Sequence, residues 1–312
     1  MTDGADAPPV IILKGVTMSN IYKSRKYVIL FLAPAFLFLI VYLYYPFFVN
    51  IYGSFRQIKN LGNYGTRWND PLLENYIKLF TDPVVFTSLK NTFFMIIATI
   101  FGQVGIALVL SLLVDNIERG TQFFRTVYFF PIVISATALG LLFNLIFLYD
   151  KGMLNQFLEL FGKADLTDWK GEKLAIFTMV LPVVWQYVGF YFVILETGLN
   201  NISQELYESA AIDGATRLQR VFYISIPLLR NVICTCMTLG VTGALKVFDL
   251  PWTMFPKGMP LKETFLTGTY MYYQTMEAKN VDYGSTLAIL IVVLGVIISK
   301  VTRSVFRESE DI

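Results

Sequence analysis

Apolar residues fill six long stretches of the chain, and polar residues gather between them. Each stretch is long enough to cross the roughly 30 Å of a bilayer's hydrocarbon core as a helix. Membrane-spanning strands would instead show segments of about ten residues with alternating polarity, which these stretches lack. The sequence therefore predicts six transmembrane helices, at 27–48, 86–114, 123–148, 174–199, 228–250 and 285–305.

The sequence predicts one membrane domain between two short terminal segments. Lys23, Arg25 and Lys26 precede the first apolar stretch, which lacks the small-residue cleavage site of a signal peptide. We therefore expect this stretch to be a retained first helix. The predicted organisation is an N-terminal segment at 1–26, a six-helix transmembrane domain at 27–307 and a short tail at 308–312.

A polar connection between the fourth and fifth stretches carries its own helix signals. Ser203 is suited to cap a helix over 205–212, and Gly214 can take the left-handed conformation that ends such a helix. A second helix is expected over 216–223. Pro227 then fits the first turn of the next membrane helix, where its missing N–H costs nothing.

Two interpretations fit this loop, which we place at 203–227. The small side chains at 209–211 let a partner approach the backbone closely, which favours a docking element for another protein. The alternative is an amphipathic helix pair that lies on the lipid headgroups. The helix pattern alone does not choose between them.

Composition supports a membrane protein and excludes several kinds of chemistry. Hydrophobic residues make up 55% of the chain and charged residues only 15%, whereas soluble domains carry about 25% charged residues. The chain has no histidine, which removes histidine metal sites, proton relays and Ser-His triads. Cys234 and Cys236 are expected to be buried thiols, too few for a disulfide framework or a four-ligand metal site. The net charge of +2 implies no nucleic-acid partner. From the residue types present we also predict no catalytic residue and no metal.

Lysine and arginine are almost equally numerous on the two sides of the membrane, so their number does not indicate the orientation. Their distance from the helix ends does. On the side of the N-terminus these charges lie in shorter segments near helix ends, where the positive-inside rule carries weight. This pattern favours a cytoplasmic N-terminus. Six spans then place both termini and the 203–227 loop in the cytoplasm.

The same loop resembles a known motif. In the EAA loop of ABC-importer permeases, Glu-Ala-Ala, three residues and Gly are followed by nine residues and Ile-x-Leu-Pro. The spacing here is the same, with Ser and Ile as conservative departures at two positions. The matching residues are Glu208, Ser209, Ala210, Ala211, Ile212, Asp213 and Gly214, and then Ile224, Ser225, Ile226 and Pro227.

Residues 27–307 are similar to the carbohydrate-uptake branch of the type I importers, which includes maltose, oligosaccharide and glycerol-phosphate permeases. A second landmark is the Phe-Asp-Leu-Pro-Trp-Thr-Met run at 248–254, which resembles the first of the two permeases in this branch. The branch continues with Gly-Gly-Gly-Pro, which the run at 255–260 replaces. This departure weakens any inference about the substrate from the loop.

The resemblance implies the MetI-like fold and a permease in the cell membrane of a prokaryote. It implies a second homologous permease, two ATPase subunits and an extracellular or periplasmic solute-binding protein as partners. ATP-Mg would be bound by the ATPases, and this chain has no Gly-x-x-x-x-Gly-Lys-Ser/Thr loop of its own. The residues implied to contact an ATPase are Glu208, Ser209, Ala210, Ala211, Asp213, Gly214, Ile224 and Pro227.

In this branch the middle helices line the substrate path, and polar or aromatic residues within the spans are the candidates here. An amide beside aromatic rings suits a sugar, since the amide bonds hydroxyls and the rings cover C–H faces. Alternatively, the amide bonds a neighbouring helix and the glycines serve packing. The candidates are Gln186, Tyr187 and Phe190, then Gly240, Gly243 and Val247, and Asn144.

Three charged residues within the spans have structural explanations. Lys246 and Asp249, three residues apart, are expected to form a local ion pair. Glu196 is expected to extend to the cytoplasmic interface.

We therefore expect a permease subunit that imports a sugar or oligosaccharide. The alternatives are a type I permease for another solute, such as glycerol-phosphate, a polyol or an amino acid, a membrane enzyme, and a membrane scaffold that uses the loop only for docking. Partner dependence discriminates among them, because only a permease should need a second permease and stimulate an ATPase.

Overall fold

The computed structural model describes residues 25–58, 67–115, 117, 120–162 and 165–307. Within these ranges the chain forms helices, turns and loops, with a single isolated β-bridge between Arg56 and Trp68. The predicted all-α class is therefore confirmed. The predicted terminal segments, 1–26 and 308–312, lie outside the described residues except for Arg25 and Lys26.

The chain divides into two compact units, Met1–Tyr52 and Gly53–Ile312, and each is described by itself. The first unit holds α2 (Arg25–Leu39), the π-helical segment η1 (Ile40–Tyr44) and most of α3 (Tyr45–Ser54). These segments follow one another without a break, and the candidate span runs over Val28–Ser54. A helix is confirmed for the first apolar stretch, and it continues beyond the predicted end.

Four helical stretches of the second unit are also long and apolar enough to cross a membrane. The first begins where the Asp82 side chain accepts a hydrogen bond from the Val84 N–H and Pro83 occupies the first turn. The four are α5 (Pro83–Ala98) with η2 (Thr99–Gly105) and α6 (Ile106–Val114), α10 (Ala175–Asn200), α14 (Arg230–Lys246) with α15 (Asp249–Met254), and α17 (Val281–Arg307).

The third predicted span, 123–148, is not one helix. It consists of α7 (Thr121–Val133) and α8 (Ala136–Ile146), which meet at an angle of 92°. Ile134 leaves the helical conformation, and α8 then packs on α15, where Gly140 lies against the Thr253 side chain. The chain therefore has five candidate spans in its described part, or six if this bent pair counts as one.

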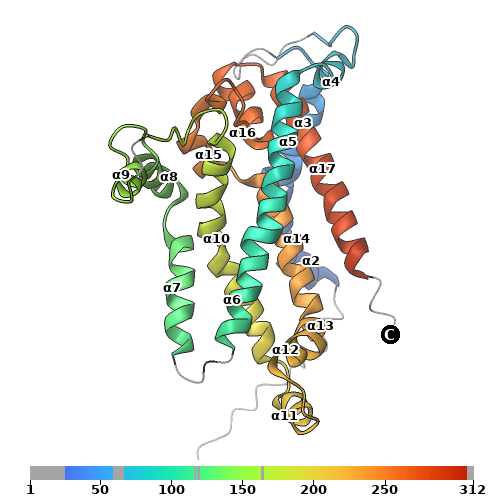
Figure 1. The fold of residues 1–312 in the computed structure, drawn as a ribbon. Coiled ribbons are helices and arrows are strands. Elements are labelled where there is room, and N and C mark those ends of the chain that lie inside the picture. The colour runs from blue at the N-terminus through green and yellow to red at the C-terminus, as the bar shows by residue number, and fades with distance from the viewer. Residues whose placement is uncertain (1–24, 59–66, 116, 118–119, 163–164, 308–312) are drawn as a thin grey trace, which may run out of the picture. The chain divides into compact units, whose positions relative to one another are not determined.

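Helix α10 lies beside α6, α7 and α14 (Figure 1). It supplies side chains with no exposed surface to the core, such as Met179, Phe192 and Leu195. At Gly189 the α10 backbone approaches α7 so closely that an added Cβ would overlap the Tyr128 carbonyl group. The central helix is thus held by close packing, as is usual where lipid offers no hydrophobic drive for helix association.

The second unit has two ends, which we call the loop end and the opposite end. The loop end carries the 203–227 loop, and the opposite end carries α4 (Glu74–Leu79), α16 (Thr267–Tyr272) and η5 (Tyr273–Glu277) (Figure 1). A buried network stabilises the opposite end, because Asp82 Oδ2 accepts from the hydroxyls of Tyr270 at 2.6 Å and Tyr283 at 2.8 Å. Two further elements are α9 (Met153–Glu159) and the 3-10 turn η4 (Pro256–Gly258).

Candidate functional site

The 203–227 loop begins with the predicted helix and glycine turn. Helix α11 (Gln204–Ile212) starts at Ser203, whose hydroxyl accepts a hydrogen bond from the Glu205 N–H at 3.3 Å. Gly214 has a φ of +78°, and the following Ala215 N–H returns to the Ala210 carbonyl at 2.9 Å. An added Cβ at Gly214 would meet nothing within 4 Å, so the backbone conformation rather than space calls for glycine.

The second half of the loop begins with the predicted helix, which is capped, but its helical backbone continues beyond the predicted end at residue 223. Thr216 and Gln219 form a capping box that starts α12 (Arg217–Arg220). The π-helical segment η3 (Val221–Ser225) and α13 (Ile226–Leu228) then follow without interruption. Pro227 lies in the first turn of α13, as predicted, but the helical backbone of η3 already precedes it. The π-helical turn just before it shifts the hydrogen-bond pattern at the point where a proline would otherwise clash with an α-helical carbonyl.

The outer surface of this loop combines small, polar and large apolar side chains. Glu208, Asp213 and Gly214 are exposed, as are the large apolar side chains of Ile212, which is 87% exposed, and Tyr223. Exposed apolar side chains on an otherwise polar loop suit contact with a protein partner or with lipid headgroups, so both interpretations of the loop remain open. A shallow hollow of this surface is lined by Ala210, Asp213, Gly214, Ala215, Gln219, Arg220, Tyr223 and Ile224. Four of the eight predicted contact residues, Ala210, Asp213, Gly214 and Ile224, line this hollow, and Glu208, Ser209, Ala211 and Pro227 do not.

A central cavity of about 220 Å³ lies among η2, α10 and the end of α14. Five of the seven predicted substrate-path residues line it: Gln186, Tyr187, Gly240, Gly243 and Val247. Its other lining residues include Gln103, Tyr191, Lys246, Phe248 and Asp249.

The amides of the cavity wall bond neighbouring backbone. Gln186 Nε2 donates to the Ile134 carbonyl at 3.4 Å, and Gln103 Nε2 donates to the Val183 carbonyl at 3.0 Å. Gln186 thus ties α10 to the bend between α7 and α8, as the packing alternative proposed. A wall amide fixed in this way can still present its carbonyl oxygen, which has acceptor capacity.

Two predicted residues lie away from the cavity. Asn144 Nδ2 donates to the Thr253 carbonyl at 3.1 Å, and its oxygen accepts from Lys170 Nζ at 2.7 Å. Asn144 thus connects α8, α15 and the connection before α10. Phe190 packs edge-on against the ring of Tyr191, with 5.2 Å between the ring centroids.

The predicted ion pair between Lys246 and Asp249 is wrong, since no such pair forms in the described part of the chain. The prediction assumed a continuous helix. Instead α14 ends at Lys246, Val247 is extended, and α15 begins at Asp249, so the i, i+3 geometry is lost. Both charged side chains line the cavity independently.

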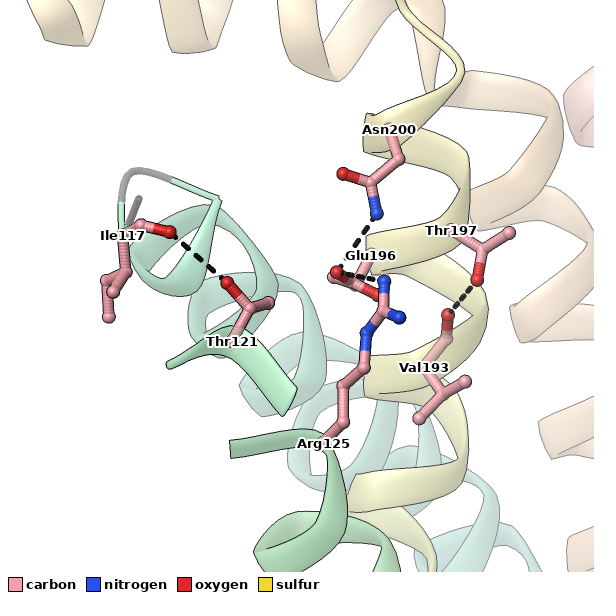
Figure 2. A network of polar contacts seen from close by, with 7 residues as sticks. All are labelled: Ile117, Thr121, Arg125, Val193, Glu196, Thr197 and Asn200. Atoms are coloured by element: carbon pink, nitrogen blue, oxygen red, sulfur yellow. Dashed lines mark hydrogen bonds and ion pairs between the residues drawn. The ribbon is translucent and has the colours of Figure 1, made fainter. Parts of the chain in front are cut away.

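The prediction for Glu196 is also wrong. Its side chain is buried, at 2% exposure, and Oε1 accepts from Arg125 Nη2 at 2.5 Å and from Asn200 Nδ2 at 3.0 Å (Figure 2). The pair joins α7 to α10 near the loop end. The signal for it was an arginine near the start of one apolar stretch and a glutamate near the end of the next, at similar depth in neighbouring helices.

An aromatic cluster beside the cavity was also missed. The rings of Phe248, Trp252 and Tyr272 lie with centroids 4.8 to 5.8 Å apart, and Phe248 lines the cavity. The sequence contained all three residues, but their meeting depends on the fold between α15 and α16. Such a cluster offers ring faces to an apolar surface of a ligand.

Comparisons with known proteins agree with this architecture. A family model of binding-protein-dependent transport system inner membrane components matches residues 107–307. The probable ABC transporter permease protein YurN of Bacillus subtilis is 31% identical, over 90% of this chain and 96% of that protein. The arabinooligosaccharides transport system permease protein AraP of Halalkalibacterium halodurans is 27% identical, over 91% of this chain and 88% of that protein.

Among solved structures, this chain is similar to one in the crystal structure of a bacterial alginate ABC transporter in complex with alginate pentasaccharide-bound periplasmic protein. The match has a TM-score of 0.80 at 19% identity and covers 95% of this chain and 98% of that chain. This likeness confirms the predicted fold of an importer permease.

Proposed function

The chain belongs to the family of inner membrane components of binding-protein-dependent transport systems, and from this premise we propose that it is the permease subunit of an ATP-driven importer of a sugar or oligosaccharide. One observation carries the proposal: the exposed 203–227 loop joins α10 directly to α14, and both helices line the central cavity. A force applied to the loop therefore acts on two walls of the cavity at once.

In the proposed mechanism, an ATPase subunit docks on the surface formed by α11, the Gly214 turn and η3. Glu208 supplies a charge-assisted hydrogen bond at this surface, and the turn at Gly214 fixes the angle between the two short helices. ATP binding and hydrolysis occur on the partner. Movement of the docked loop rocks α10 and α14 as rigid bodies, so that the cavity opens alternately to each side.

The cavity suits a neutral or mixed-charge sugar. Gln186, Lys246 and Asp249 provide groups for hydroxyls, and the ring of Phe248 covers C–H surface. A permease relative acts on arabinooligosaccharides, and the similar solved transporter is complexed with an alginate-loaded periplasmic protein. These names support a carbohydrate substrate for this chain too.

The proposal includes an orientation and a set of partners. The loop end faces the cytoplasm with both termini, where two ATPases are available, and a solute-binding protein delivers the sugar at the opposite end. A second homologous permease completes the translocation path, and lipids surround the pair.

The test is ATP hydrolysis by the complex co-purified with its partners and reconstituted in liposomes, with a binding protein loaded with a panel of oligosaccharides. Glu208→Ala removes a charge-assisted bond, and Gly214→Val strains the turn. We expect each to cut the stimulated hydrolysis about tenfold, which corresponds to about 1.4 kcal/mol. A loaded binding protein that stimulates the wild type identifies the sugar.

Gly120→Val is the matched control. Gly120 also has a positive φ, +97°, with nothing within 4 Å of an added Cβ, but it lies outside the loop in the connection before α7. Its substitution therefore introduces similar strain without touching the docking surface. Co-purification without any ATPase, or loop variants that hydrolyse ATP like the wild type, would overturn the proposal.

A further inference from the structure

A second cavity, of about 510 Å³, lies where the 203–227 loop meets the ends of α6 and α10. It shares no lining residue with the central cavity, and the proposed transport path does not use it. Its wall is mostly polar. The lining residues are Asp115, Leu199, Asn200, Ile202, Gln204, Tyr207, Arg217, Arg220, Val221 and Ser225.

Positive charge dominates this cavity. Arg217 and Arg220 both line it, and neither forms an ion pair with any carboxylate in the described residues. The Nε of Arg220 is buried without a hydrogen-bond partner in that same part of the chain. A buried cationic donor without a partner is costly, so such a group signals a missing acceptor.

Asp115 is the one acid among the lining residues. Partial burial, together with the nearby Glu196 carboxylate, raises the pKa of Asp115 above its ordinary value, while Arg217 lowers it. Glu196 itself is already bound by Arg125 and Asn200 (Figure 2). Glu196 is therefore not an ion-pair partner of Arg217 or Arg220.

Hydrogen bonds fix several residues of the cavity wall. The capping box at Thr216 and Gln219 fixes the start of α12, and with it both arginines. Across the cavity, the Tyr207 hydroxyl and Ser225 Oγ are hydrogen-bonded at 2.9 Å. Asn200 is held by its bond to Glu196. The backbone of the wall is therefore fixed, while the exposed side chain of Arg217 and the half-buried side chain of Arg220 remain available to a ligand.

We propose that this cavity binds the phosphate group of an anionic ligand, either a lipid headgroup or free phosphate, through Arg217 and Arg220. Guanidinium groups match phosphate oxygens with paired hydrogen bonds. The position supports the same chemistry, because Asp115 follows directly on the apolar span Pro83–Val114 and Asn200 ends the span Ala175–Asn200. Headgroup phosphates lie at the level where spans end. Ile202 and Val221, both half-buried, offer apolar surface to the neighbouring glycerol and acyl groups.

The experiment measures binding to the complex purified in detergent, with no solute, nucleotide or binding protein present. One arm counts retained phosphatidylglycerol by native mass spectrometry. The other arm titrates inorganic phosphate into delipidated complex and follows the thermal unfolding midpoint. Binding in the first arm alone identifies a headgroup, and binding in both identifies a site open to free phosphate as well.

The variants are Arg217→Gln and Arg220→Gln, with Arg230→Gln as the matched control. Arg230 is exposed, lies on the following helix and does not line the cavity, so its substitution changes the net charge by the same amount. We expect each cavity variant to weaken binding about tenfold, as is typical for the loss of a charge-assisted bond. Asp115→Asn, which removes the opposing acid, is expected to strengthen binding.

The proposal is overturned if the wild-type complex binds neither ligand, or if Arg230→Gln reduces binding as much as the cavity variants do. It is also overturned if the cavity variants bind like the wild type. Because no readout involves transport or ATP hydrolysis, these outcomes leave the proposed import function unaffected.

Discussion

At the scale of single residues, the ion pair between Arg125 and Glu196 places a charged carboxylate among the packed helices. Its carboxylate side chain is 3% exposed, whereas the arginine side chain is 37% exposed. Removing a charge from water is unfavourable, and the partner offsets that cost only when the geometry is good. Glu196 therefore depends on Arg125 and Asn200 more than Arg125 depends on it.

This asymmetry predicts the effect of breaking the pair from the arginine side. Arg125→Leu leaves a buried carboxylate without its cation and should destabilise the complex by about 3 kcal/mol. Replacing both partners, Arg125→Leu with Glu196→Leu, should restore most of that stability. Thermal unfolding in detergent measures both, with Glu172→Leu as a control at an exposed glutamate. A double variant no more stable than the single one would contradict this account.

At the scale of elements, the contact between α7 and α10 depends on Gly189, because its missing side chain lets the Tyr128 carbonyl group approach. The same helix pair carries the Arg125–Glu196 contact one to two turns away. Gly243 on α14 differs, since an added Cβ there would meet nothing within 4 Å. The two glycines thus serve different purposes although both lie within spans.

Alanine substitutions separate these two situations. Gly189→Ala forces α7 away from α10 and should cost about 1–3 kcal/mol of stability, as overpacked sites do. Gly243→Ala should change stability by less than about 1 kcal/mol. The measurement is the unfolding midpoint of the purified complex. Equal effects at both positions would mean that close approach at Gly189 does not hold these helices together.

Local chemistry explains which elements the sequence could predict. Ser203 and Gly214 act on their own neighbours, so the cap and the left-handed turn were visible in the residue order. The break at Ile134 was not, because it lies in an apolar run that also suits a straight helix. Packing of α8 on α15 accompanies that bend, and the end of α14 at Lys246 is equally a tertiary effect.

In the candidate site, too, some residues could be placed from local sequence and others depend on tertiary packing. Gln186 and Gly240 could be placed from helix periodicity, since each lies within a regular helix. Asn144 could not, because its helix turns away after the break. The aromatic cluster of Phe248, Trp252 and Tyr272 joins two elements that are distant in sequence, which no local pattern reveals.

At the scale of the whole molecule, the central cavity and the exposed loop are linked by two continuous helices. Phe248 stands where one of them, α14, gives way to α15. Its ring lines the cavity and also stacks on Trp252, at 5.8 Å between centroids. We therefore expect Phe248 to contact the substrate, whereas it is not among the residues that line the hollow of the loop.

Transport kinetics test this role. Phe248→Leu should raise the KM for sugar uptake roughly fivefold to tenfold, because an aromatic platform contributes on the order of 1 kcal/mol beyond its burial. Phe177→Leu, an exposed phenylalanine on α10 away from the cavity, is the matched control. An unchanged KM in the first variant, or equal changes in both, would remove Phe248 from the substrate path.

The right-angled bend between α7 and α8 has a consequence for the surrounding membrane. Helix α7 has 13 residues, which is about 20 Å of helix, less than the hydrocarbon thickness of an ordinary bilayer. If α7 alone crosses the bilayer at this flank, we expect the lipid beside it to thin locally to match the shorter helix. Acyl chain length is thus a variable to which this flank responds, and thinner bilayers fit it better than thicker ones.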